Sequence, residues 1–393
     1  MVRIDFDAWR ERIRRETLGN YHLRMGTAIE REGNATAALD AYRRAMAANP
    51  DSLTAHYRAY LLLNLLGHAE EAAAVDREAR ARRRDYQAEC QDGMVRDLLE
   101  SGQFEEARAL ADELLAADGS ATRIRLSAEV EAAWGNHLEN QRYTAESAEH
   151  FERALTIDPQ QPHAHYWAGM RRFTAFDMAG AEPHLEQAVA GMPEHHWAAC
   201  MLGFVWLVRD RLDEASRLIA QAAPCLVETQ KPWAYGHLGL AAHMQGDAEA
   251  AAVGFHRAAA LDPKEAWVFC YIGLGLLGQR RPAEAERMFR RSTTLDRNAL
   301  LYRACLGLAL VEQGRSEEGL RMVRDTAARE TTFAMPILVQ ALAEDRQGNR
   351  DAALALCRKA ANLQPQFIGY VIRLLVWEAE RLKAIFRGIG FPL

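Results

Sequence analysis

The sequence has no uninterrupted apolar stretch approaching the roughly 18 residues that a membrane-spanning helix needs. Its N-terminus, MVRIDFDAWRERIRRETLGN, carries charges from the third residue onward and lacks the apolar core of a signal peptide. Both absences argue against a membrane-spanning or an exported protein, so we expect a cytoplasmic one. The net charge is −6, which argues against a general nucleic-acid binder.

Cysteine and lysine are scarce. The 393 residues include 6 cysteines, no two of which form a C-x-x-C pair, and most lie within apolar helical stretches. This distribution is typical of reduced, buried thiols rather than of a disulfide framework or a zinc ribbon. Arginine greatly outnumbers lysine, and together with the richness in alanine this bias indicates a GC-rich bacterial genome.

Sequence motifs of common enzyme classes are also missing. There is no G-x-x-x-x-G-K-[ST], no G-x-G-x-x-G before a helix, no G-x-S-x-G and no H-E-x-x-H. Four histidines at 163, 165, 195 and 196 could gather at adjacent helix starts, but no cysteine or carboxylate obviously completes a metal site. We therefore expect a protein that is not an enzyme and that holds no metal or cofactor.

The sequence does contain a repeat. Gly239 is followed by Ala251, Phe255, Ala258 and Pro263, at offsets of 12, 16, 19 and 24 residues. The same offsets recur, with varying fidelity, from ten anchor positions. These anchors are Gly26, Tyr60, Val95, Gly135, Gly169, Gly203, Gly239, Gly273, Gly307 and Ala341. Their spacing is 34 residues almost everywhere, with about six more before Gly135 and two more before Gly239.

This pattern resembles the tetratricopeptide repeat, and the resemblance covers residues 18–365. It implies an all-α protein, a right-handed α-solenoid of about ten helix–turn–helix repeats. Glycines between the two helices of most copies suit a left-handed helix cap. We expect an N-terminal capping helix over 1–17, the repeat array over 18–365, and a C-terminal capping helix with a tail over 366–393. Caps of this kind cover the open ends of a solenoid.

In this family the first helix of each repeat lines the concave surface. On that helix a stripe is formed by positions six and three before the anchor and one and four after it, opposite the stripe that packs within the repeat. The stripe is partly polar in the first four copies and becomes apolar and aromatic from the fifth. The candidate binding residues there are His163, Tyr166, Met170, Phe173, Trp197, Phe204, Leu207, Trp233, Leu240, His243, Trp267 and Leu274.

A helix that is apolar on two faces must bury both or offer one to a partner. The sequence therefore predicts an adaptor or assembly factor that captures an apolar or aromatic segment of another protein in a concave groove. A carboxylate clamp is not expected, because no lysine stands on the stripe and Arg31, Arg96 and Asn136 lie far apart in the array. Two alternatives stay open. The stripe could be ordinary core, or the chain could be a self-associating scaffold, a homo-oligomer whose groove is filled by its own C-terminal helix or by a second copy.

Overall fold

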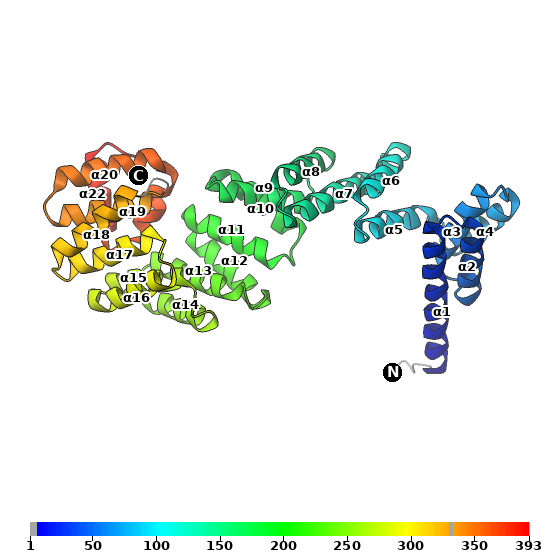
Figure 1. Cartoon of the computed structure of the whole chain (residues 1–393), viewed down its shortest axis with the longest axis horizontal. Helices are drawn as coiled ribbons and strands as arrows, with labels where there is room; N and C mark the ends of the chain where they lie inside the picture. Colours follow the sequence, from blue (N-terminus) through cyan, green and yellow to red (C-terminus); the bar gives the residue numbers. More distant parts are fainter. Residues whose placement is uncertain (1–5, 330–332, 393) are drawn as a thin grey trace. The chain divides into compact units, whose positions relative to one another are not determined.

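The computed structural model describes residues 6–329 and 333–392, and every regular element within these ranges is helical (Figure 1). This confirms the all-α prediction. The chain divides into two compact units, Met1–Pro159 and Gln160–Leu393, and each is described by itself. None of the described helices combines the length and the apolar content that crossing a membrane requires.

The first unit contains eight helices among its described residues. They are α1 (Phe6–Arg31), α2 (Ala35–Ala48), α3 (Leu53–Leu65), α4 (Ala69–Arg82), α5 (Tyr86–Glu100), α6 (Phe104–Ala117), α7 (Ala121–Asn140) and α8 (Thr144–Ile157).

The second unit contains the remaining helices and three short 3₁₀ turns. They are α9 (Pro162–Thr174), α10 (Met178–Gly191), α11 (His196–Val208), α12 (Leu212–Ala222), η1 (Ala223–Cys225), α13 (Lys231–Met244), α14 (Ala248–Leu261), α15 (Ala266–Gly278), α16 (Pro282–Leu295), α17 (Leu300–Glu312), α18 (Ser316–Arg329), α19 (Ala334–Arg346), α20 (Arg350–Leu363), η2 (Pro365–Phe367), α21 (Ile368–Leu374), η3 (Val376–Glu378) and α22 (Ala379–Gly388).

Helices α1 to α20 form sequential hairpins, and each odd-numbered helix carries one of the ten anchor positions. Seven of the ten anchors are glycines, and over each of these lies the side chain sixteen residues later. A Cβ atom at Gly273 would stand 2.5 Å from the ring of Phe289, and one at Gly239 would stand 2.8 Å from the ring of Phe255. Glycine therefore lets the two helices of a hairpin approach closely, and the larger side chain fills the space between them.

The turn of every hairpin places the seventh residue after the anchor in the left-handed backbone region. Six of the ten are glycines with φ between 73° and 83°, as the sequence predicts: Gly33, Gly67, Gly102, Gly246, Gly314 and Gly348. The other four are not glycines. They are Arg142, Phe176, Asp210 and Arg280, with φ between 60° and 70°. All ten turns thus have the same geometry, although the left-handed conformation is unfavourable for the four residues that carry a Cβ atom.

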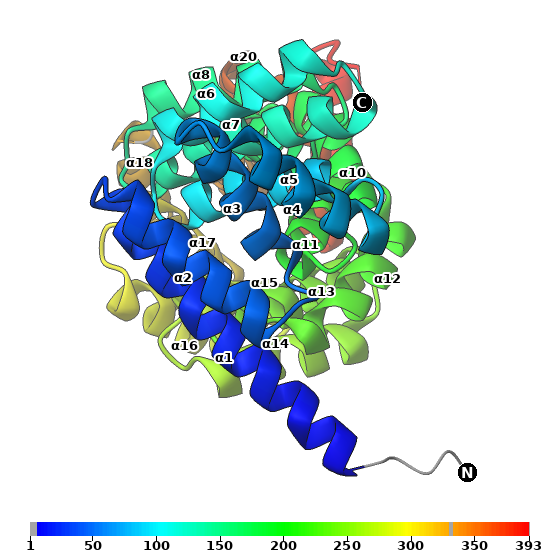
Figure 2. The same cartoon turned by 90° about the vertical axis from the view of Figure 1, so that its right-hand side faces the viewer.

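Irregular spacings in the sequence have simple structural outcomes. The longer interval before Gly135 is taken up by α7, whose 20 residues exceed the length of the later odd-numbered helices. The two additional residues before Gly239 lie where η1 and an irregular segment follow α12. At the start of the chain α1 runs without a break from Phe6 to Arg31, and its first turns extend beyond its partner α2 (Figure 2).

The two units differ in how their interiors are connected. Buried apolar residues of the second unit form one continuous core from Tyr166 to Phe386, whereas those of the first unit form three smaller clusters. Stacked hairpins bury their apolar faces against the next hairpin, so the longer run of regular, apolar copies gives the more continuous core.

The four strained turns make a prediction about stability. Arg142→Gly and Arg280→Gly should each stabilise the fold by about 1 kcal/mol, because both side chains are exposed and glycine removes the cost of the left-handed conformation. Thermal unfolding of the full chain measures this as a higher midpoint. The reverse change, Gly246→Ala, should lower the midpoint. A lower midpoint for both arginine variants would contradict the strain at these turns.

Candidate functional site

The predicted concave stripe of the second unit divides into buried and accessible side chains. Leu207, Leu240 and Leu274 have no exposed surface, and Tyr166 and His243 are also buried. His163 is exposed. The remaining members are partly buried against the core, namely Met170, Phe173, Trp197, Phe204, Trp233 and Trp267. The three leucines therefore belong to the core of the unit. The partly buried side chains, together with His163, form the surface that another molecule could reach.

The three tryptophans belong to a continuous line of rings along α11, α13 and α15. The ring centroid of Trp197 lies 5.2 Å from that of Trp233, which stacks on His237 at 3.8 Å. His237 in turn lies 5.2 Å from Trp267, and Trp267 lies 5.6 Å from Tyr271. We call these five side chains the aromatic row. Edge-to-face and stacked pairs at such distances add to the stability that burial provides.

His237 and Tyr271 were not among the residues that the stripe predicts. Both stand two residues before their anchors, Gly239 and Gly273, and so lie between the two stripes of the first helix. A signal for them is present in the sequence. Rings recur at this offset in the fifth, seventh and eighth copies, where Trp167 is the third example.

Trp267 shows why part of the row is structural. Its six-membered ring lies over the backbone of Gly236, so closely that a Cβ atom at this position would clash with it. Position 236 is the stripe position three before the anchor, where the neighbouring copies carry Cys200 and Cys270. Glycine at 236 therefore makes room for the tryptophan of the next repeat.

His237 is held as a neutral side chain. Its Nδ1 lies 2.7 Å from the carbonyl oxygen of Trp233, to which it donates a hydrogen bond. Burial between the two tryptophans lowers the pKa of His237 to about 4, and the hydrogen bond to the Trp233 carbonyl opposes this shift only partly. A charged imidazole would be costly in the middle of the aromatic row.

The carboxyl-terminal ends of the same helices are covered by the chain's own C-terminal segment. His243, at the end of α13, donates from Nε2 to the carbonyl oxygen of Leu374 on α21, at 2.8 Å. Trp377 of η3 lies 6.2 Å from the His243 ring, and Tyr370 of α21 lies 6.3 Å from Phe204 on α11. The predicted binding residue His243 is thus engaged within the chain.

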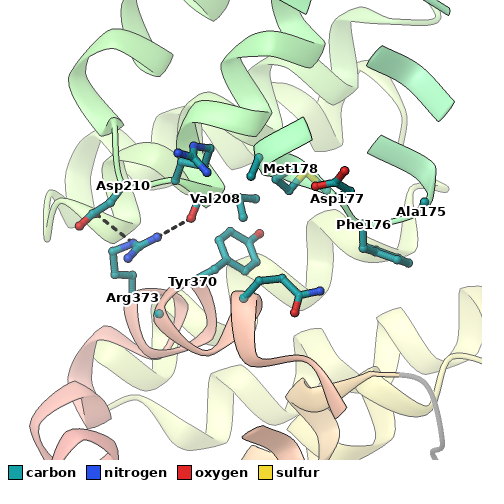
Figure 3. Close-up of a pocket in the computed structure, with 12 residues that line it drawn as sticks. Ala175, Phe176, Asp177, Met178, Val208, Asp210, Tyr370 and Arg373 are labelled. Carbon is teal, nitrogen blue, oxygen red and sulfur yellow. Dashed lines mark hydrogen bonds and ion pairs between the residues drawn. The ribbon is translucent and has the colours of Figure 1, made fainter. Parts of the chain in front are cut away.

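An arginine anchors α21 to the end of α11. Arg373 donates from Nη2 to the Val208 carbonyl oxygen at 2.7 Å, and its Nε lies 3.1 Å from Asp210 Oδ1. Figure 3 shows this side chain pointing from α21 toward both partners, at the edge of a cavity of about 580 Å³. Because the guanidinium satisfies a helix-terminal carbonyl and pairs with a carboxylate, it fixes the position of α21 against α11.

The histidines expected at adjacent helix starts have separate partners. His165 Nδ1 lies 2.9 Å from His184 Nδ1, whereas His195 accepts a hydrogen bond from the Ala198 amide and packs on Tyr166. Over residues 6–329 and 333–392, no three histidine, cysteine or acidic side chains gather as metal ligands would.

The polar stripe of the first unit is used internally. Arg58 pairs with Glu30 at 3.2 Å, and Arg96 lies 3.7 Å from Glu129 in the next repeat. Arg123 is bound to Asp92 in the same way. These pairs connect successive first helices to one another.

Comparison with known proteins identifies the repeat. A profile described as "Tetratricopeptide repeat" matches residues 93–162. A comparison with curated protein sequences found no match.

Several solved structures resemble the chain. The human IFIT1 dimer with m7Gppp-AAAA is 15% identical, with a TM-score of 0.48, over 86% of this chain and 87% of that one. Yeast Tom70 is 13% identical, with a TM-score of 0.42, over 95% and 92% of the two chains. The protein pilF of Pseudomonas aeruginosa is 19% identical, with a TM-score of 0.39, over 56% and 96%.

The buried histidine gives a testable pH dependence. Because the pKa of His237 is lower in the folded state than the usual 6.5, its contribution to stability is complete above about pH 6.5 and is lost as the pH falls toward 4. The loss at pH 4 should be on the order of 3 kcal/mol. His237→Gln retains a side-chain donor without the titration. The free energy of unfolding, measured with denaturant between pH 7 and pH 4, should therefore fall less steeply with pH for this variant than for the wild type. The same dependence on pH in both proteins would contradict the neutral, buried state of His237.

Proposed function

Since this chain is a tetratricopeptide-repeat protein, a fold generally associated with protein–protein interaction, we propose that it is an adaptor or assembly factor. It captures an apolar or aromatic segment of a partner protein on the concave face of its second unit. The observation that carries this proposal is the aromatic row, which brings rings from three successive repeats into one line at the protein surface.

The composition of the row suits a binding surface. Trp197, Trp233 and Trp267 are all partly buried, so each is fixed by its neighbours and still has exposed ring surface. Rigid tryptophans bury a large apolar area with little loss of side-chain entropy, and they are enriched among the residues that dominate binding energy. Met170 and Phe173, in the carboxyl-terminal half of α9, are partly buried as well and border the surface.

The position of the C-terminal segment limits which part of the helices a partner can reach. Because α21 covers the carboxyl-terminal ends of α11 and α13, a partner has access to the amino-terminal halves of these helices. The tryptophans all stand there, six residues before their anchors. Exposed His163 has the same place on α9. The proposed path of the partner segment therefore runs across the helix starts, from α9 to α15.

Trp197 is the best residue for a test. It stands in the first turn of α11, and its ring is in contact with one ring of the row, that of Trp233. Trp267 is less suitable because its ring is wedged against Gly236, so that its removal would leave a cavity in the core. Trp206 provides a matched control. It stands on the same helix, outside the stripe, and lies under the guanidinium of Arg211.

We expect a phage-displayed peptide library selected on the full chain to yield peptides rich in apolar and aromatic residues. Trp197→Ala should weaken the binding of the selected peptides about tenfold or more in calorimetric titrations, because the loss of a tryptophan that anchors a ligand commonly costs about 2 kcal/mol. Trp206→Ala should leave the affinity within about twofold. Both variants are first compared with the wild type by circular dichroism.

Equal losses in the two folded variants would contradict a site on the aromatic row. Concentration-dependent self-association of the wild type that competes with the peptides would instead support the scaffold alternative, in which a second copy occupies the row.

A further inference from the structure

A second cavity of the unit, of about 600 Å³, lies between the first helices of the later repeats and the C-terminal segment. Its walls come from α11, α15, α17, α18, α19, η2 and α21, and from the turn between α9 and α10. This volume falls within the range of small-molecule sites in proteins, which are concave, mostly apolar and furnished with a few polar groups. The aromatic row adjoins it at Tyr271, which lines the cavity.

The walls are aromatic and aliphatic. The rings are those of Phe176, Phe204, Tyr271, Tyr302, Phe333, Phe367 and Tyr370. Phe176 is held in place although its φ of 60° is unusual for a bulky residue. Its ring contacts Phe333 and Phe367 edge-on, at centroid distances of 5.4 and 5.6 Å. The apolar wall is therefore held in place by contacts among its own rings.

The hydroxyl groups in the cavity carry no charge. Burial raises the pKa of Tyr370 to about 12, and burial together with the neighbouring Tyr370 raises the pKa of Tyr271 well above its usual range. Burial likewise raises the pKa of Tyr302. The surroundings thus disfavour a charge in the interior of the cavity, so that the body of a suitable ligand is uncharged.

One cation stands at the cavity. Arg329 is the only arginine or lysine among the described lining residues, and no aspartate or glutamate is among them. Arg329 is held loosely. Its nearest carboxylate oxygen, on Asp325, is 4.0 Å away, and the two side chains are 59% and 52% exposed. The guanidinium can therefore take a better acceptor, and a carboxylate is the group whose geometry it matches.

We propose that this cavity binds a small amphipathic acid, with an alkyl or aromatic body among the rings and one carboxylate on Arg329. The apolar lining supplies most of the affinity, since burial of hydrocarbon is favourable in proportion to its area. Arg329 supplies the preference for an anionic end. This site does not depend on the capture of a partner protein by the aromatic row.

The test uses three probes with the same body, namely decanoate, decan-1-ol and decylammonium, titrated calorimetrically into the full chain. Decanoate should bind at one site per chain and about fivefold more tightly than decanol, because a partly exposed ion pair contributes up to about 1 kcal/mol. Decylammonium should bind more weakly than either. Arg329→Gln should reduce the affinity for decanoate to that for decanol and leave decanol unchanged.

Arg321→Gln is the matched control, since Arg321 stands on the same helix, is 75% exposed and pairs with Glu317. It should retain the full preference for decanoate. Leu301→Trp, which fills the cavity, should abolish the binding of both decanoate and decanol, and its thermal unfolding shows whether it is folded. Absence of saturable binding in the wild type would overturn the proposal. So would a preference for decanoate that survives Arg329→Gln.

Discussion

The close approach of the seven glycine anchors to the side chains sixteen positions later determines how most hairpins of this protein are built. At Gly239 and Gly273 the ring of a phenylalanine on the second helix lies where a Cβ atom would otherwise stand. At Gly203 the same place is taken by Ile219, so the contact requires a large apolar side chain rather than a particular one. This contact fixes the distance between the two helices of a hairpin. The turn keeps one geometry in all ten copies, since the residue seven positions after each anchor has a positive φ.

The same packing geometry produces the aromatic row. Successive first helices are close enough for Trp267 to lie on the backbone of Gly236, and Trp233 stacks on His237 in the space between them. Each tryptophan is thereby rigid and still partly exposed. The C-terminal segment covers part of the same helices. Arg373 and Leu374 bind the ends of α11 and α13, which leaves the helix starts accessible.

Much of this arrangement could be predicted from the sequence. The offsets from the anchors predict the hairpins, and the six turn glycines predict left-handed caps, because few other residues tolerate that conformation. The positive φ of Phe176 and Arg280 could not be predicted from their residue types and follows only from the register of the repeat. The predicted stripe includes the tryptophans but not His237. This residue stands two positions before its anchor, at an offset where rings recur in three copies but which lies outside the stripe.

The packing of the C-terminal segment could be predicted only in part. Its apolar character predicts burial but not against which surface. In the structure α22 packs on α20, where Arg350 reaches the Ala384 carbonyl oxygen, while α21 packs against α13 and Arg373 holds it to the end of α11. The apolar pattern of the sequence is similar in α21 and α22, so it does not predict which surface each helix covers. Two hydrogen bonds place α21, from Arg373 to the Val208 carbonyl and from His243 to the Leu374 carbonyl, and each joins residues more than a hundred positions apart.

The proposed binding site at the helix starts depends on the packing of α21 against the carboxyl-terminal ends of α11 and α13. Hydrogen exchange of peptides covering 368–375, measured by mass spectrometry on the full chain, tests this packing. We expect these peptides to exchange as slowly as α13, and to exchange faster in Arg373→Met because the bonds to Val208 and Asp210 are lost. Exchange of these residues at the rate of an unprotected peptide would contradict it.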